Sequence, residues 1–142
     1  MDVKRYFNEK NLNMLKGAGM LLILMYKVPS LPIVLHRVCM AGGLSLMTIG
    51  IVIQIRLFGV QSLLLCNKPE KRGILEWLGR YWVVYLSLHI WETRFLNWGD
   101  VYAFIPAYWL EEVIFKLLFL LFVGFCIVLC FRRVSELNGL KE

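Results

Sequence analysis

The sequence predicts an all-α, polytopic helical membrane protein with about four transmembrane helices. The 142-residue chain is 59% hydrophobic, with a mean hydropathy of +0.65. A soluble protein of this size could not bury so much apolar surface. Its basic residues flank the apolar segments, as cytoplasmic loops do, and form no patch that would indicate a nucleic-acid partner. We therefore expect the lipid bilayer to surround most of this chain.

The first predicted transmembrane segment, 14–35, contains three residues that interrupt its apolar run. These are Lys27, Pro29 and Pro32. Proline removes a backbone donor, and lipid offers nothing to replace the lost hydrogen bond. The segment can span the bilayer if both prolines lie at the far interface.

Three further segments, 38–58, 74–95 and 113–131, have the length and apolarity of membrane helices. The segment 38–58 carries small residues that allow a neighbouring helix to approach closely. These are Gly42, Gly43, Ser45 and Gly50, and we expect Gly42, Gly43 and Ser45 to face another helix.

Loop charge predicts the orientation of these helices. Lysine and arginine residues precede the first segment, separate the second from the third, and follow the fourth at Arg132 and Arg133. The 96–112 stretch is instead acidic, with aromatic residues typical of a membrane interface. A multi-pass protein of the cell membrane with both termini in the cytoplasm satisfies this distribution.

The 74–95 segment is unusual because it contains Arg80, His89 and Glu92. An ionisable residue at the middle of a membrane helix costs roughly 2.5 to 3.5 kcal/mol, so it usually faces a protein interior or a watery cavity. On a helix, Tyr85, His89 and Glu92 share one face at i, i+4 and i+7, whereas Arg80 lies on another. Glu92 can raise the basicity of His89, an arrangement suited to proton transfer. A structural hydrogen bond within a helix bundle is the alternative.

The same stretch, LGRYWVVYLSLHIW, resembles the late transmembrane motif of the acyltransferase-3 family, L-G-[KR]-x-S-x-x-x-Y-L-x-H. The serine of that motif is replaced by Trp82. The resemblance covers about residues 38–133. The matching positions are Leu78, Gly79, Arg80, Tyr85, Leu86 and His89.

A second segment resembles an early helix of that family, K-G-[IA]-A-[IL]-L-L-V-x-x-x-H. Lys16 and Gly17 begin the matching stretch, KGAGMLL, but the position of the family's histidine is occupied by Lys27. A protonated lysine is a poor general base, and His36 does not fit the spacing. The early match can be a coincidence, or the chain can be a truncated or internally deleted relative.

The resemblance implies transfer of an acyl group, with acetyl-CoA as donor, to a hydroxyl of a carbohydrate or lipid-linked glycan. His89 would then be the catalytic base, supported by Glu92 and Tyr85. Family members have many more transmembrane helices than this chain can supply. The competing reading is therefore a small non-catalytic membrane protein, or a subunit that packs against membrane helices of another chain.

No metal site is expected from the sequence. The four cysteines lie in or beside apolar runs and lack the spacing of zinc ligands. We expect them to pack as small hydrophobic residues: Cys39, Cys66, Cys126 and Cys130.

Overall fold

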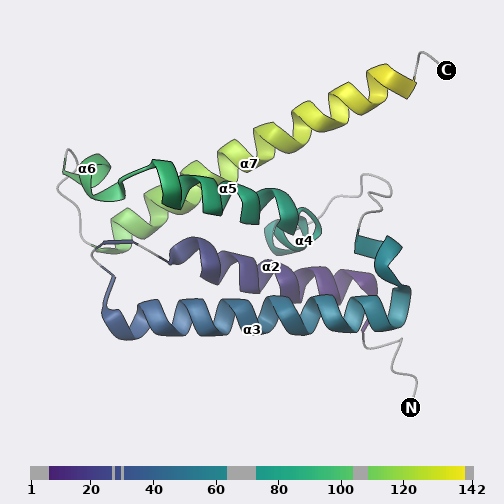
Figure 1. The fold of residues 1–142 in the computed structure, drawn as a ribbon, viewed down its shortest axis with the longest axis horizontal. Coiled ribbons are helices and arrows are strands. Elements are labelled where there is room, and N and C mark those ends of the chain that lie inside the picture. Colours follow the sequence, from purple (N-terminus) through teal and green to yellow (C-terminus); the bar gives the residue numbers. More distant parts are fainter. Residues whose placement is uncertain (1–6, 27, 30, 64–72, 104–108, 140–142) are drawn as a thin grey trace.

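The described residues of this computed structural model form helices and no strands (Figure 1). The prediction of an all-α protein is therefore confirmed for this part of the chain. The structure describes residues 7–26, 28–29, 31–63, 73–103 and 109–139.

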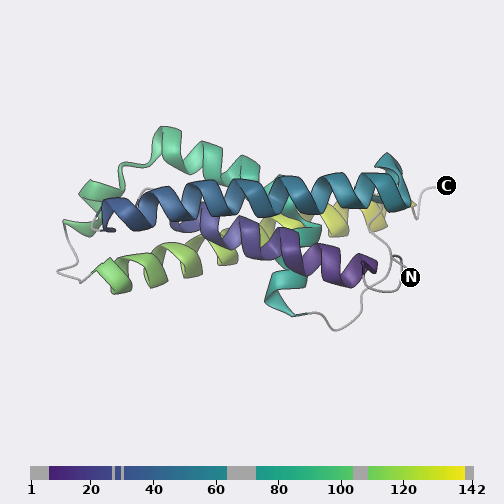
Figure 2. The ribbon, with the colours of Figure 1, turned by 90° about the horizontal axis from the view of Figure 1, so that it is seen from below.

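Helices α2 (Glu9–Met25) and α3 (Ile33–Phe58) form an antiparallel hairpin and lie side by side in both ribbon views (Figures 1 and 2). Asn8 caps α2, because its side-chain oxygen accepts a hydrogen bond from the Asn11 amide at 2.8 Å. The helix ends at Met25, ten residues before the end of the predicted segment 14–35. The chain reverses before α3 begins directly after Pro32, a residue well suited to precede a helix because it has no amide proton to satisfy.

The predicted helix 74–95 is two helices, α4 (Ile74–Arg80) and α5 (Trp82–Phe95). The chain bends sharply at Tyr81, whose φ of −99° and ψ of 26° leave the helical region. In Figure 1, α5 lies in the plane of the view while α4 is seen almost end-on. Neither piece reaches the roughly 20 residues that a membrane-crossing helix needs.

Three elements complete the chain. A short 3₁₀ turn, η1 (Val60–Leu63), follows α3, and α6 (Trp98–Tyr102) follows α5. Helix α7 (Trp109–Gly139) extends beyond both ends of the predicted 113–131 segment. Its carboxyl-terminal half projects away from the other helices (Figure 1).

Glycines set the distance between α2 and α3. A methyl group on Gly43 would lie 2.8 Å from the carbonyl oxygen of Gly19, and one on Gly50 would lie 2.7 Å from Cγ of Lys16. The prediction that small residues of α3 face another helix holds for Gly43, which is buried, and for Gly42, where an added methyl group would contact Leu22 of α2. It is wrong for Ser45, which is exposed.

The main hydrophobic core lies where α2, α3, α4, α5 and α7 meet. Its aromatic member is Tyr85, and the others are aliphatic or methionine side chains. The buried residues of this core are Met20, Ile23, Leu24, Met47, Leu78, Tyr85, Leu88 and Leu120.

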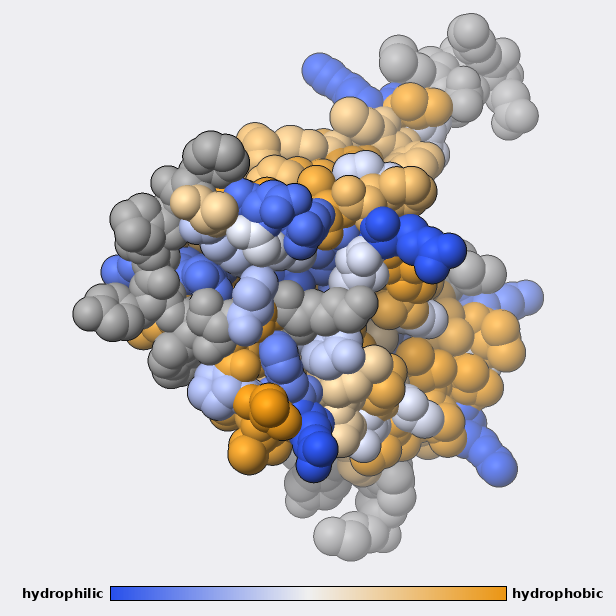
Figure 3. All heavy atoms as spheres, turned by 60° about the vertical axis from the view of Figure 1, so that its left-hand side comes forward, coloured by the Kyte–Doolittle hydropathy of each residue, from blue (hydrophilic) through white to orange (hydrophobic). Residues whose placement is uncertain are grey.

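Two of the described helices are long and apolar enough to cross a membrane, α3 and the Leu110–Glu136 part of α7. Only 28% of the most apolar 18-residue stretch of each helix is buried, so these helices present most of their hydrophobic side chains to the surroundings. The face drawn in Figure 3 accordingly carries broad hydrophobic areas, interrupted by separate hydrophilic groups. The structure thus supports two candidate membrane helices among the described residues and does not show the four crossings that the sequence predicts.

Candidate functional site

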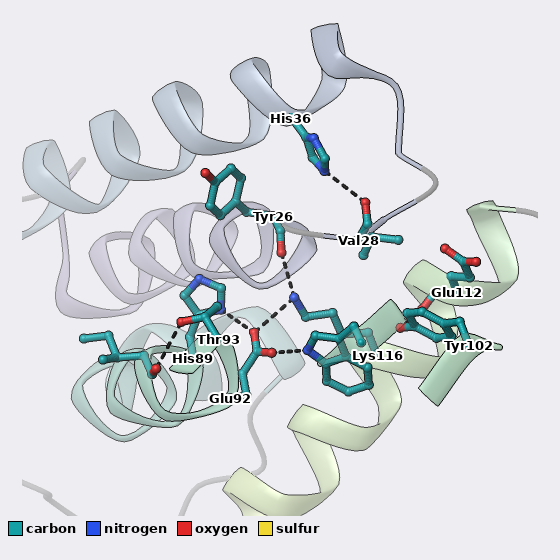
Figure 4. A network of polar contacts seen from close by, with 11 residues as sticks. Tyr26, Val28, His36, His89, Glu92, Thr93, Tyr102, Glu112 and Lys116 are labelled. Carbon is teal, nitrogen blue, oxygen red and sulfur yellow. Dashed lines mark hydrogen bonds and ion pairs between the residues drawn. The ribbon is translucent and has the colours of Figure 1, made fainter. Parts of the chain in front are cut away.

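A cluster of buried polar side chains is centred on Glu92 of α5, whose side chain is completely buried. Its Oε1 lies 2.8 Å from Nδ1 of His89 and 3.0 Å from Nζ of Lys116 (Figure 4). The indole nitrogen of Trp98 donates a hydrogen bond to the other carboxylate oxygen. One carboxylate therefore holds a histidine from its own helix, a lysine from α7 and a tryptophan from α6.

Lys116 is fully buried and compensated on several sides. Its ammonium group donates to the backbone oxygen of Tyr26 at 2.6 Å, and it lies 5.5 Å from the centre of the Trp98 ring. A buried charge needs such partners, because an unpaired ion in an apolar interior costs several kcal/mol. Lys116 thus joins α7 both to α5 and to the end of α2.

His36 lies next to this cluster without belonging to it. Its Nε2 is 3.0 Å from the backbone oxygen of Val28, and its ring meets that of Tyr26 edge-on with centroids 5.7 Å apart. The orientation predicted from the loop charges places Lys27 and His36 at a similar outer level of the bundle to His89. Lys27 is outside the described residues.

Tyr85 is buried on the same helix but makes its contacts elsewhere. Its hydroxyl accepts a hydrogen bond from Nε1 of Trp77 at 3.1 Å and donates to the backbone oxygen of Leu121 at 3.4 Å. The structure therefore brings His89 and Glu92 together, as their spacing predicts, whereas the Tyr85 hydroxyl bonds to α4 and α7.

Two distant segments meet at the crossing of α2 and α4. A methyl group on Gly17 would lie 2.6 Å from the carbonyl carbon of Leu75, and one on Gly79 would lie 2.6 Å from that of Asn13. Backbones approach this closely only where side chains are absent. The Lys16-Gly17 segment and the Leu78-Gly79-Arg80 segment are thus packed directly against each other.

Sequence reasoning missed two members of the cluster, Lys116 and Trp98. The signal for Lys116 was present, because it is a charged residue within an apolar segment and such residues usually find a buried partner. Trp98 could not be found in this way. It comes from a different helix, and a tryptophan at the end of an apolar segment is expected at a membrane interface in any case.

The described residues contain no group of three side chains that could hold a metal ion. The three cysteines among them, Cys39, Cys126 and Cys130, are free thiols, and their burial decreases in that order. Cys66 lies outside the described residues.

Comparisons with protein-family models, with curated proteins and with solved structures find no match to this chain.

Proposed function

We propose that this chain is a membrane-bound O-acyltransferase of the acyltransferase-3 type, or part of one, that transfers an acetyl group from acetyl-CoA to a hydroxyl of a carbohydrate or glycan. The observation that carries this proposal is the 2.8 Å contact between Nδ1 of His89 and the buried carboxylate of Glu92. The two atoms lie at ion-pair distance without the alignment of a hydrogen bond. A carboxylate this close to one ring nitrogen stabilises the imidazolium that forms when the other nitrogen takes up a proton.

In the proposed reaction, Nε2 of His89 takes the proton of the acceptor hydroxyl. The hydroxyl oxygen then bonds to the thioester carbonyl carbon, the carbon–sulfur bond breaks, and the proton passes to the departing thiolate. Glu92 is a positioning residue, held in place by Lys116 and Trp98. Tyr85 has no direct part, because its hydroxyl bonds to Trp77 and Leu121.

The meeting of two segments supports the same proposal. The stretches that resemble the early and the late motif of the family lie far apart in the sequence, yet Gly17 and Gly79 place them in backbone contact. The contact brings the two stretches into one part of the bundle, as a site built from both would require.

We further propose a multi-pass arrangement in the cell membrane with both termini in the cytoplasm. Helices α3 and α7 would cross the bilayer, with the shorter helices packed against them. The loop charges favour this orientation when the chain passes four times, because the basic stretch between α3 and α4 then lies on the same side as both termini.

A second candidate function is a non-catalytic membrane subunit. The observation that favours it is the contact of Glu92 with Lys116, Trp98 and His89, because such a cluster can hold helices together without any part in catalysis. In that case, helices of another chain would supply any active site.

Transfer of a labelled acetyl group from acetyl-CoA to a panel of sugar acceptors, in membranes containing the full chain, tests the proposal. We expect wild-type membranes to label an acceptor and His89→Gln to lower labelling at least a hundredfold, because glutamine cannot take up the proton. His36→Gln is the matched control and should keep transfer within twofold. Full transfer by His89→Gln would exclude His89 as the base.

A further inference from the structure

A hydrophobic groove lies between α4, α5 and α7, away from the polar cluster. Its volume of about 450 Å³ falls within the roughly 300–1,000 Å³ that small-ligand sites occupy. No charged side chain lines it. The lining residues are Ile74, Trp77, Tyr85, Leu118, Leu121, Phe122 and Phe125.

The polar atoms on the floor of this groove are bonded to one another. Trp77 donates to the Tyr85 hydroxyl, and that hydroxyl donates to the backbone of Leu121. The Tyr85 ring reaches the surface of α7 because residue 124 is glycine; a methyl group there would lie 2.7 Å from Cζ of Tyr85. The floor is therefore fixed, and it offers an occupant apolar surface without free hydrogen-bonding groups.

The stripe of α7 that lines the groove continues to a pair of positive charges. Leu118, Phe122 and Phe125 follow one another at helical spacing along one face. Arg132 and Arg133 stand seven and eight residues beyond Phe125, which places them on that face about 10 Å further along the helix. An occupant of the groove can thus be apolar at one end and negatively charged at the other.

We propose that the groove holds one acyl chain of an anionic phospholipid, whose phosphate is bound by Arg132 and Arg133. Guanidinium groups match phosphate in geometry and charge. Along α7 the groove begins about 10 Å from Arg132, at Phe125, and ends about 21 Å from it, at Leu118. Since one leaflet with its head groups is about 20 Å deep, the groove would hold the deeper half of an acyl chain. This inference rests on the membrane placement of α7 and is independent of the proposed acyl transfer.

Native mass spectrometry of the full chain, purified in detergent with phosphatidylglycerol or phosphatidylcholine, tests the proposal. We expect one phosphatidylglycerol to be retained, several-fold more than phosphatidylcholine. Leu118→Trp places an indole in the groove and should lower retention of both lipids several-fold. Leu44→Trp alters an exposed leucine of α3 and is the matched control, which should bind as the wild type does.

A second set of variants tests whether Arg132 and Arg133 bind the lipid phosphate. Arg132→Gln with Arg133→Gln should reduce phosphatidylglycerol retention to the phosphatidylcholine level, whereas Arg94→Gln, an exposed arginine at the end of α5, should leave it unchanged. Equal retention of both lipids by the wild type would contradict the role of the arginines.

Unchanged retention in Leu118→Trp would show that lipid binds elsewhere and would overturn the proposal. If this variant does not fold, Phe122→Trp makes a smaller change in the same groove and should give the same loss. Because the measurement follows lipid and not transfer, its failure is distinct from failure of the proposed enzymatic function.

Discussion

Replacing Lys116 by methionine removes the cation that joins three helices while keeping most of the side chain's volume. The variant loses the 3.0 Å contact to Glu92, the 2.6 Å hydrogen bond to the Tyr26 oxygen and the position beside the Trp98 ring. The largest consequence is that Glu92 keeps its charge in a fully buried site with one partner fewer. We therefore expect a substantial loss of folding stability.

The size of this loss follows from the burial of both groups. Removing one member of a buried ion pair costs about 3–5 kcal/mol, because the remaining charge is left without compensation. The lost hydrogen bond and ring contact belong to the same change and do not add to it in full. Replacing both charges, with Lys116→Met and Glu92→Gln together, should recover part of the stability since no unpaired ion remains.

Unfolding in mixed detergent and denaturant, followed by the fluorescence of the five tryptophans, measures this loss. Lys10→Met is the matched control, because Lys10 is exposed in the first turn of α2. Its effect should stay within about 0.5 kcal/mol. The reasoning is refuted if Lys116→Met unfolds like the control.

Two further predictions concern packing and pH. Gly79→Ala would bring a methyl group to 2.6 Å from the Asn13 carbonyl carbon, so we expect this variant to lose at least about 3 kcal/mol of folding stability in the same unfolding assay. Gly73→Ala is the control and should be neutral, because a methyl group there meets no atom within 4 Å. Equal stability of the two variants would contradict the close approach of α2 and α4. Burial raises the pKa of Tyr102, whose hydroxyl donates to the backbone oxygen of Glu112 at 2.9 Å. The hydroxyl therefore stabilises the fold below the ordinary tyrosine pKa of about 10, and this contribution falls as pH rises above it. An unfolding series from pH 8 to 11.5 should show a smaller alkaline loss in Tyr102→Phe than in the wild type, and identical losses would count against this assignment.

The helical class and the His89–Glu92 contact followed from sequence because both depend on local spacing. Apolar composition predicted helices, and three residues along a helix bring two side chains within reach whatever surrounds them. The early end of α2 was also signalled, since Pro29 and Pro32 stand in the last third of the predicted 14–35 range. The error there was to extend a helix through residues that oppose it.

The break at Tyr81 could not be predicted from local sequence. Tyr81 is neither glycine nor proline, and the Gly79-Arg80 pair before it does not by itself end a helix. The bend follows from tertiary contacts, because α4 is drawn onto α2 by Gly17 and Gly79 while α5 turns towards α7. Tyr85, His89 and Glu92 are all buried on one face of α5, as their spacing predicts. The hydrogen bonds of the Tyr85 hydroxyl with Trp77 and Leu121 depend on tertiary packing and could not be predicted.

Ser45 shows a different kind of error, one of helical periodicity. Gly43 and Gly50 are seven residues apart and share one face of α3, which is the face that α2 covers. Ser45 is two residues from Gly43 and therefore lies about 200° around the helix. Small size alone was treated as evidence of an interface, whereas position on the packed face decides it.

The proposal that His89 is a catalytic base is tested most directly by release of coenzyme A from acetyl-CoA by the purified full chain, in the presence of an acceptor that it labels. The account predicts release above the uncatalysed rate for the wild type and background release for His89→Gln, with the unfolding free energy of the two proteins within about 1 kcal/mol of each other. Release by His89→Gln at the wild-type rate, or no release by a folded wild-type protein with any acceptor, would contradict it.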